Sequence, residues 1–386
     1  MNPRPSRSPP CSPPASCPIP GATRVESVAH SAAALTLPLD AAELARLDAA
    51  FPELATQRPP LTAPPPAEAE AVLLLGSPAA GKSSRVQPLV DRGYVRLNRD
   101  DLGGTLDQLV PLLARAHETG ARHFVLDNTY GTRKSRAALL TRCAELNLPT
   151  RAVWLDAPEE AAQFNAARRL LARYGRHLDP RELQRADPDA PNTFPPVVIS
   201  TYQRSFEPPT VEEGFAAVER VPYARVLGPE YRHRALLLDY DGTLRISTGR
   251  HPYPTRPEEV QVLPGRAEIL QRFRDAGWRL LGVSNQSGIA AGTLTPEAAE
   301  ACFAETHRQL GLDLELRYCP HPAGAPKCFC RKPMPGFGVE FIERHHLDPA
   351  ACLFVGDLPS DARFAAACGF RYHDAADFFA EPPDPA

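Results

Sequence analysis

A short apolar run followed at once by a glycine-rich loop is the feature that most constrains the fold of this chain. Residues 71–75 read Ala-Val-Leu-Leu-Leu, which predicts a buried strand, and the loop Gly76-Ser-Pro-Ala-Ala-Gly81-Lys82-Ser83 follows directly. Glycines allow backbone amides to turn toward phosphates, the lysine can reach the β- and γ-phosphates, and the serine hydroxyl can hold Mg²⁺. This Walker A pattern predicts an ATP site formed by Gly76, Gly81, Lys82, Ser83 and Ser84.

Length and charge limit the classes of protein that this chain can belong to. Its 386 residues are enough for two domains, and a net charge of −3 lacks the strong basic excess of a protein that coats DNA. No run of about 18 apolar residues is present, and prolines and serines occupy residues 1–17, where a signal peptide would need an apolar stretch. We therefore expect a cytoplasmic protein without membrane contact.

The distribution of proline indicates where a packed core is absent. The chain has 44 prolines that cluster in residues 1–20 and 59–66, so we expect residues 1–69 to form a largely disordered extension. Within it, residues 18–54 resemble the C-terminal part of aldo/keto reductases through an Ile-Pro-Gly-x-Thr-Arg turn and a Glu-Leu-x-x-Leu-Asp helix. No barrel precedes this segment, so we interpret it as a remnant or a misplaced start and not as an NADP site.

Three further apolar runs each end in acidic side chains. Strands are expected at residues 94–98, 123–126 and 152–155, and they lead into Asp100, Asp127 and Asp156. Strands that alternate with helices predict a doubly wound parallel sheet, whose ligands bind at the carboxyl ends of the strands. We favour functional roles for Asp100 and Asp127, with Asp100 able to accept the proton of an attacking hydroxyl. Asp156 precedes Ala-Pro-Glu-Glu and is better explained as a helix cap.

Arginines are frequent beyond the fourth predicted strand. Asn165 is followed by Arg168 and Arg169, and further arginines stand at positions 173, 176, 181 and 185. Such clustering suits a lid that clamps transferring phosphates. A solvated helix face explains most of these arginines, so only Arg168 and Arg169 are predicted to bind ATP.

Four motifs of this first half occur together in a known family: Gly-x-x-x-x-Gly-Lys-Ser, Asn98-Arg-Asp100, Asp127-Asn-Thr129 and Asn165-x-x-Arg168. They resemble the kinase domain of polynucleotide kinase-phosphatases, and residues 202–215 resemble the segment that closes this domain in the animal enzymes. The resemblance implies a kinase domain over residues 70–230, with Asp100 as the base toward a 5′-hydroxyl, Asp127 and Asn128 at the acceptor, and Arg168 stabilising the transition state. Gly103 stands where the viral relative has an acceptor-binding arginine, so acceptor recognition stays open.

A second apolar strand, expected at residues 235–238, leads into Asp239-Tyr-Asp241-Gly-Thr-Leu. Asp239 can attack phosphorus, while Asp241 can protonate the leaving group and then activate water. A calcium-binding loop is the alternative, but no glutamate closes a loop of EF-hand spacing. The pattern resembles the nucleophile motif of haloacid dehalogenase-type phosphatases.

Later residues supply what such a phosphatase needs besides its nucleophile. Ser284 and Asn285 follow a predicted strand and can bind phosphate oxygens, and Lys332 can neutralise the phosphoryl group. The sequence Gly356-Asp-Leu-Pro-Ser-Asp361 adds an acidic pair. We therefore expect a Mg²⁺ site made by Asp239, Asp241 through its backbone carbonyl, Asp357 and Asp361.

Three of the nine cysteines lie close to a histidine, in the set Cys319, His321, Cys328 and Cys330. Three thiolates and an imidazole form a closed tetrahedral set, which is typical of structural zinc. The arrangement resembles the bisphosphatase of heptose biosynthesis and the histidinol-phosphatase branch of the same superfamily, over residues 234–375. The resemblance implies a phosphatase domain over residues 231–386, in which Arg331 contacts the substrate.

The predicted fold class is α/β, with a P-loop kinase domain and a haloacid dehalogenase-like phosphatase domain, each built on a doubly wound parallel sheet. The first functional hypothesis is an enzyme that phosphorylates 5′-hydroxyl nucleic-acid ends with ATP and hydrolyses phosphate monoesters, with 3′-phosphate ends as the expected substrate. The alternative is a sugar-phosphate or histidinol-phosphate phosphatase fused to a small-metabolite kinase. A non-catalytic sensor is disfavoured because the catalytic residues are all present. The choice between DNA and RNA and the oligomeric state stay open.

Overall fold

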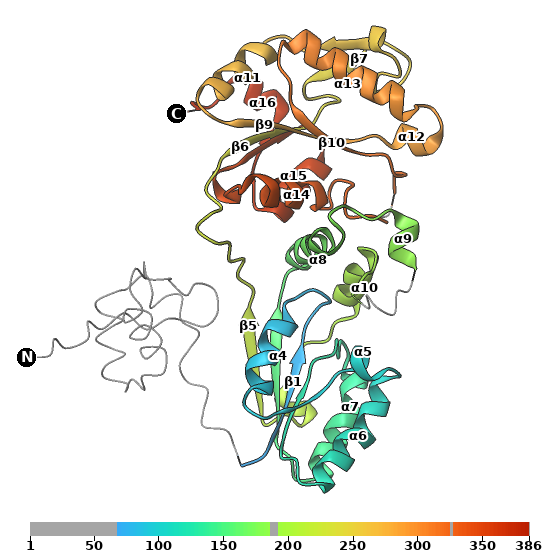
Figure 1. Ribbon diagram of the computed structural model, residues 1–386, viewed down its shortest axis with the longest axis vertical. Coiled ribbons are helices and arrows are strands. Elements are labelled where there is room, and N and C mark those ends of the chain that lie inside the picture. The colour runs from blue at the N-terminus through green and yellow to red at the C-terminus, as the bar shows by residue number, and fades with distance from the viewer. Residues whose placement is uncertain (1–67, 186–191, 325–326, 386) are drawn as a thin grey trace, which may run out of the picture. The chain divides into compact units, whose positions relative to one another are not determined.

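The computed structural model describes residues 68–185, 192–324 and 327–385, and it confirms the predicted fold class of two parallel-sheet α/β domains (Figure 1). Each sheet has five strands. The disordered extension predicted for residues 1–69, with its aldo/keto reductase-like segment, lies outside the described residues except for residues 68 and 69.

The first sheet has the strand order β2-β3-β1-β4-β5, and all of its pairs are parallel. Its strands are β1 (Glu70–Leu75), β2 (Val95–Leu97), β3 (His123–Leu126), β4 (Thr150–Asp156) and β5 (Ala217–Pro222). The apolar run predicted as a strand is the central strand β1, and its last five residues are buried. The chain passes from β1 to β2 on one side of β1 and later from β3 to β4 on its other side, so the carboxyl end of β1 lies at the switch point at which such sheets bind ligands.

Helices connect the strands of the first sheet. They are α4 (Lys82–Val90), α5 (Arg99–Leu102), α6 (Leu106–Glu118), α7 (Arg133–Glu145), α8 (Glu159–Tyr174), α9 (Pro180–Gln184) and α10 (Val197–Ser205), with a 3₁₀ turn at Val211–Glu213. Asp156 is the last residue of β4, and α8 begins three residues later behind Pro158, whose side chain cannot cap it. The cap predicted at Asp156 is therefore wrong; its carboxylate pairs with Arg220 instead.

The second sheet has the strand order β10-β9-β6-β11-β12, and its pairs are also parallel. Its strands are β6 (Ala235–Leu238), β9 (Arg279–Asn285), β10 (Glu315–Cys319), β11 (Leu353–Gly356) and β12 (Arg371–Asp374). A separate antiparallel pair, β7 (Arg245–Ser247) with β8 (Val260–Val262), follows β6. All four residues of β6 are buried, as its uninterrupted apolar sequence predicts.

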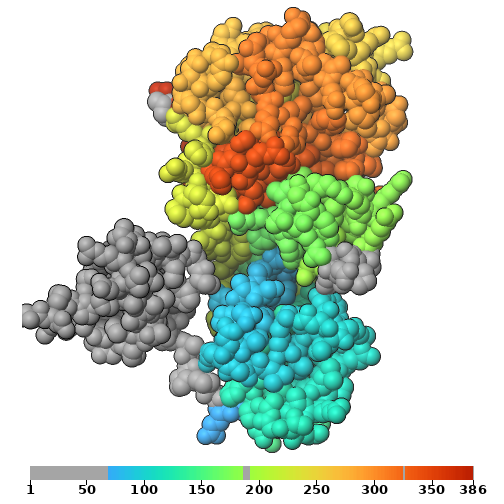
Figure 2. Space-filling model, in the orientation of Figure 1, coloured from blue at the N-terminus to red at the C-terminus, as the bar shows by residue number. Residues whose placement is uncertain are grey.

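Helices cover both faces of the second sheet. They are α11 (Arg266–Asp275), α12 (Ser287–Ala291), α13 (Pro296–Leu310), α14 (Gly336–His345), α15 (Pro359–Cys368) and α16 (Ala375–Ala380). Figure 1 shows α14 and α15 on one face and α11, α13 and α16 on the other, and each group contributes to its own buried cluster. In the space-filling view the orange segment that contains α13 covers much of this domain (Figure 2).

Helix α8 also packs against α14 and α15. Phe164, Ala167 and Leu170 of α8 belong to the same buried cluster as Phe341 and Phe364. Arg225 lies 3.7 Å over the ring of Phe164, and it donates one hydrogen bond of 2.8 Å to Ala367 O near the end of α15. Among the described residues, one buried cluster therefore combines helices of the first domain with strands and helices of the second.

None of the helices that the structure describes is both long and apolar enough to cross a lipid bilayer.

A fully buried arginine holds the segment that resembles the closing stretch of polynucleotide kinases. Arg136 of α7 donates to the two carboxylate oxygens of Glu213 at 2.7 and 2.8 Å. It also donates to the backbone oxygens of Tyr130 and Glu207, at 2.9 and 3.0 Å. These four hydrogen bonds satisfy the buried guanidinium of Arg136. They fix the segment that contains Glu207 and Glu213 to α7.

We predict that Glu213→Ala lowers the free energy of unfolding by about 3–5 kcal/mol, because it leaves the Arg136 guanidinium buried without its anion. Urea unfolding monitored by circular dichroism measures this loss. Glu212→Ala is the matched control, since Glu212 is exposed. Equal unfolding midpoints for the two variants would contradict the structural role assigned to the pair.

Candidate functional site

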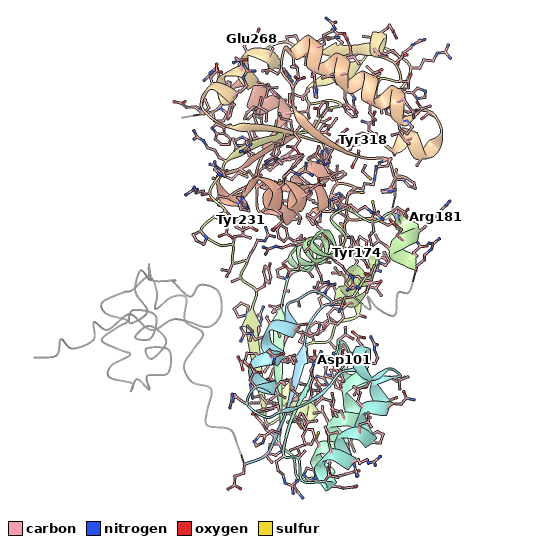
Figure 3. All side chains as sticks on the ribbon, in the orientation of Figure 1. Asp101, Tyr174, Arg181, Tyr231, Glu268 and Tyr318 are labelled. Carbon is pink, nitrogen blue, oxygen red and sulfur yellow. The ribbon has the colours of Figure 1, made fainter. Side chains whose placement is uncertain are left out.

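The first candidate site is a cavity of about 690 Å³ at the carboxyl edge of the first sheet. It is lined by residues of the glycine-rich loop, of α5, of the segment after β3 and of α8. The predicted residues among them are Gly81, Lys82, Ser83, Asp100, Asp127, Asn128 and Arg169. In Figure 3, Asp101 marks the α5 side of this region. The structure thus brings the predicted phosphate-binding and acceptor-side residues to one cavity.

The loop between β1 and α4 depends on two glycines with positive φ. Gly76 has a φ of +151°, and a Cβ at this position would lie 2.9 Å from the backbone oxygen of Leu155. Gly81 has a φ of +95° and stands directly before α4. Side chains other than glycine are strained at these angles, so both residues are needed for the shape of the loop.

Lys82 is folded back over the loop. Its Nζ donates to the backbone oxygens of Gly76 and Ser77 at 2.8 and 3.0 Å. Burial lowers the pKa of Lys82 to about 8, which means that an anion beside it would be strongly favoured. Ser84 is placed differently from the prediction, because it does not line this cavity and its hydroxyl donates to Gly81 O at 2.7 Å.

The acceptor side of the cavity is ordered by amide and arginine side chains. Asn98 accepts hydrogen bonds from the backbone amides of Asp100 and Asp101, which caps α5 and aims both carboxylates. Asn128 accepts from the backbone amide of Arg99 at 2.9 Å and donates to Leu97 O at 3.3 Å. Asn128 therefore joins β3 to β2, and it also lines the cavity in which the acceptor is predicted to bind.

Asp127 is buried and paired with an arginine that the sequence analysis missed. Arg96 of β2 donates to both oxygens of Asp127, at 3.0 and 2.8 Å, and its remaining nitrogen lies 2.7 Å from Asp101. The hydrogen bond to Asp127 raises the pKa of Arg96. The only sequence signal was an arginine inside a short strand, which is also a common surface feature.

The two arginines predicted to clamp ATP point in different directions. Arg169 lines the cavity, donates to Asn192 O at 2.9 Å and lies over the ring of Phe194. Arg168 does not line it; its Nε is 2.8 Å from a carboxylate oxygen of Glu343 in α14. Consecutive helix residues are rotated by about 100°, so the two cannot face the same ligand. The prediction that Arg168 binds ATP is not supported by this placement.

The second candidate site lies at the carboxyl ends of β6 and β11, the central strands of the second sheet. Lys332 Nζ lies 2.5 Å from an oxygen of Asp239 and 2.8 Å from an oxygen of Asp361. Burial raises the pKa of Asp239 to about 7. Burial disfavours the charged form of Lys332, but the two carboxylates outweigh this effect and raise its pKa. The site therefore holds a buried cation between two buried acids.

The acidic residues of this site fit a divalent cation. Oxygen atoms of Asp239, Asp357 and Asp361 lie within 4.8 Å of one another. Gly242 lets Asp357 approach the loop, because a Cβ at Gly242 would lie 2.2 Å from its carboxylate. Carboxylate oxygens from two strand ends are the donors that Mg²⁺ prefers, and excess negative charge beyond one lysine favours such an ion.

Both oxygens of Asp241 are held by side chains that the sequence analysis did not identify. Arg245 Nε donates to one oxygen at 2.9 Å and Gln286 Nε2 donates to the other at 2.8 Å. Arg245 is 1% exposed and also donates to Cys302 O and Thr306 Oγ1 of α13. These contacts orient the carboxylate proposed as the acid. No motif contains Arg245 together with α13, so sequence alone did not indicate the contact.

The predicted phosphate-binding residues divide into two groups. Ser284 is buried at the end of β9 and accepts a hydrogen bond of 2.9 Å from Gln286. Asn285 donates to Lys332 O at 3.1 Å and accepts from its backbone amide at 3.0 Å, so its amide is occupied in holding the lysine. Asn285 therefore positions Lys332, and its predicted contact with phosphate stays a prediction. Arg331 is half-buried and donates to His321 O at 3.4 Å.

The four predicted zinc ligands come together in one cluster. Cys319 Sγ lies 3.8 Å from Cys328 Sγ and 3.4 Å from Cys330 Sγ, and His321 Nδ1 lies 3.4 and 3.2 Å from the sulfurs of Cys319 and Cys330. A tetrahedral zinc with metal–sulfur bonds of about 2.3 Å places its sulfur ligands about 3.8 Å apart. The donor set and its spacing therefore fit zinc.

Comparisons with known proteins agree with the second site. The profile of the family described as haloacid dehalogenase-like hydrolase matches residues 249–369. The chain is 33% identical over 148 residues to the D-glycero-beta-D-manno-heptose-1,7-bisphosphate 7-phosphatase of Haemophilus ducreyi, covering 36% of this chain and 80% of the relative. The chain thus belongs to the haloacid dehalogenase-like hydrolase family. Its C-terminal domain is a phosphatase of that family.

Solved structures give weaker likenesses. The D,D-heptose 1,7-bisphosphate phosphatase from B. bronchiseptica, complexed with magnesium and phosphate, matches at 30% identity over 36% of this chain and 78% of that one, with a TM-score of 0.33. A chain of the Pnkp1/Rnl/Hen1 RNA repair complex matches at 15% identity over 81% of this chain and 97% of that one, with a TM-score of 0.28.

We predict that the purified protein contains about one zinc per chain and that Cys328→Ser loses it, because three ligands hold the ion far more weakly than four. Elemental analysis by mass spectrometry measures the metal content. Cys143→Ser is the matched control, since Cys143 is buried in the first sheet's core and lies outside the cluster. Absence of zinc from the unmodified protein, purified without chelators, would contradict the assignment.

Proposed function

We propose that this chain heals nucleic-acid ends with two active sites, one that adds a phosphate to a 5′-hydroxyl and one that removes a phosphate from a 3′ end. The observation that carries the proposal is that Lys82 shares one cavity with Asp100 and Asp127. ATP binding alone needs only the loop, whereas carboxylates facing it suit transfer of a phosphoryl group to a hydroxyl. The resemblance of these residues to polynucleotide kinase-phosphatases supports a nucleic-acid acceptor, and the use of ATP suits a cytoplasmic enzyme.

In the proposed kinase reaction, the oxygen of the 5′-hydroxyl attacks the γ-phosphorus of ATP, and Asp100 accepts the proton of that hydroxyl. The bond from that phosphorus to the β-phosphate oxygen breaks, and ADP leaves. Lys82 and Arg169 offset the negative charge of the transferring group, and Ser83 would hold the Mg²⁺ that accompanies ATP. Asp127, fixed by Arg96, orients the acceptor through a hydrogen bond.

In the proposed phosphatase reaction, Asp239 attacks phosphorus while the bond to the leaving alcohol breaks, and Asp241 donates a proton to the leaving oxygen. Asp241 then takes a proton from water, whose oxygen displaces Asp239 and releases phosphate. Lys332 and Ser284 lie where they can stabilise the phosphoryl oxygens. A Mg²⁺ ion held by Asp239, Asp357, Asp361 and the backbone carbonyl of Asp241 would supply further positive charge.

A second candidate function is supported by the relatives. Two of the relatives are named as heptose-bisphosphate phosphatases, and the predicted zinc ligand set resembles the same branch. This candidate is a sugar-phosphate phosphatase fused to a kinase for a small metabolite. The Asn98-Arg-Asp100 motif and the segment held by Arg136 favour the nucleic-acid acceptor instead.

An oligonucleotide that carries a 5′-hydroxyl and a 3′-phosphate tests the proposal directly. We expect incubation with the protein, ATP and Mg²⁺ to add one phosphate at the 5′ end and remove one at the 3′ end, as measured by mass spectrometry of the products. Gain without loss would retain the kinase and exclude 3′-phosphate as the phosphatase substrate. No change at either end, with hydrolysis of heptose 1,7-bisphosphate, would establish the second candidate.

Variants should separate the two activities, because the sites lie on different sheets. Asp239→Asn is expected to lower phosphatase turnover by more than about 1,000-fold and to leave kinase turnover unchanged, since it removes the nucleophile. Lys82→Ala is expected to lower kinase turnover by about 100-fold or more and to leave the phosphatase unchanged. Steady-state kinetics measures both activities on each variant.

Controls for these variants are available in the chain. Asp313→Asn changes a fully exposed carboxylate, and Lys134→Ala changes an exposed lysine of α7. Both controls should retain both activities. Loss of both activities in folded Asp239→Asn protein would show that the two sites are not independent.

A further inference from the structure

A basic cavity of about 490 Å³ lies at the amino edge of the second sheet. The cavity is lined by Arg232, His233 and Arg234, which precede β6, by Arg279, which begins β9, and by Arg274 in the last turn of α11, the helix marked by Glu268 in Figure 3. Arg279 is the register partner of Ala235, so the two strand starts are adjacent. Asp239 follows the other end of β6, about 13 Å away along the strand. The cavity is thus separate from the proposed phosphatase site.

The lining of this cavity carries positive charge without acidic residues. By contrast, three other cavities in the described part of the chain are each lined by at least one acidic residue: Asp100, Asp179 and Asp156, respectively. Arg274 has Asp275 at 3.8 Å, but within the described residues no ion pair involves Arg232 or Arg279. The chain as a whole has 46 acidic and 43 basic residues, so the cluster does not follow from composition. Mutual repulsion of these groups is relieved when an anion binds.

A simpler explanation accounts for only part of the cluster. Arg274 lies in the last turn of α11, where a basic side chain complements the helix dipole. Arg234 also serves this terminus, because it donates to the backbone oxygen of Ala276, the C-cap residue of α11. Arg232 and Arg279 come from two other segments, and no hydrogen bond from their side chains to a helix end is found among the described residues. The helix dipole therefore does not explain why Arg232 and Arg279 line the same cavity.

The cavity is also pre-ordered in a way that suits phosphates. Arg234 donates to Ala276 O at 2.7 Å, and its guanidinium lies 5.0 Å from the ring centre of Trp278. Trp278 is 7% exposed and donates to Pro385 O at 2.8 Å, so its ring supports the arginine and is not open for base stacking. Arginines without an accessible aromatic face recognise backbone charge and not base identity.

We propose that this basic cavity binds backbone phosphates of a nucleic-acid strand, away from both catalytic sites. The choice of ligand rests on the proposed function, in which the ends to be processed belong to long polyanions. A second contact on the same strand raises the effective concentration of its end at the protein. The protein should therefore bind long strands more tightly than short ones, without a preference for sequence.

The test measures binding of fluorescein-labelled single-stranded 30-mer and 4-mer oligonucleotides to the full chain by fluorescence anisotropy, without ATP or Mg²⁺. The salt concentration is varied from about 50 to about 200 mM, the range over which phosphate contacts weaken strongly. Arg232→Gln/Arg279→Gln is expected to weaken binding of the 30-mer about tenfold at low salt and to reduce the slope of log affinity against log salt by about 1.4. Both side chains are exposed, so the variant should fold normally. Arg115→Gln/Arg308→Gln removes the same charge from exposed positions elsewhere and is the matched control.

Each result decides the proposal. A loss specific to the Arg232/Arg279 variant and to the 30-mer supports it. Equal affinity and slope in the two double variants would overturn it, and so would an equal loss of affinity for the 30-mer and the 4-mer. Failure of the proposed function is distinguishable, because it would appear as absence of end processing by the unmodified protein while the difference in binding persisted.

Discussion

The constraint on which both candidate sites depend is the parallel pairing of each sheet. Parallel strands present all their carboxyl ends at one edge, so residues that follow different strands meet there although they are far apart in sequence. Asp127 after β3 and the loop after β1 converge in this way in the first sheet, as do Asp239 after β6 and Asp357 after β11 in the second. Short βα connections then decide which side chains reach the shared space.

Both candidate sites also depend on buried charged side chains that are held by partners of opposite charge. Lys332 lies between Asp239 and Asp361, and Arg96 holds Asp127 with two parallel hydrogen bonds. Removing such groups from water costs free energy that only well-placed partners offset, so each group is held by several contacts. Asp127 has both oxygens bonded to Arg96, which suits a role in orienting a ligand, whereas Asp100, whose side chain pairs with the exposed Arg99, is accessible to a substrate proton.

The predicted zinc ligands and α8 belong to one buried core that connects the second sheet with the first domain. Cys319, Cys328 and Cys330 belong to the same buried cluster as Phe164 and Leu170 of α8. A metal held by these cysteines would therefore stabilise a core shared by the second sheet and the helices of the first domain. Arg168, Arg225 and His177 add polar contacts from the first half of the chain to Glu343, Ala367 and Glu340.

The sequence by itself determined the strands that carry each motif, the order of the motifs and the chemical type of each site. These features depend on short-range rules: apolar runs make buried strands, glycines permit loops with positive φ, and closely spaced cysteines can share a metal. Only the tertiary structure decided which side chains meet, such as Lys332 with Asp239, which lie 93 positions apart, Arg245 with Asp241 and α13, and Arg96 with Asp127. It also decided that Asn285 holds Lys332 and that Arg168 turns away from Arg169. Those outcomes depend on helix rotation and on the packing of distant segments, which a local motif does not encode.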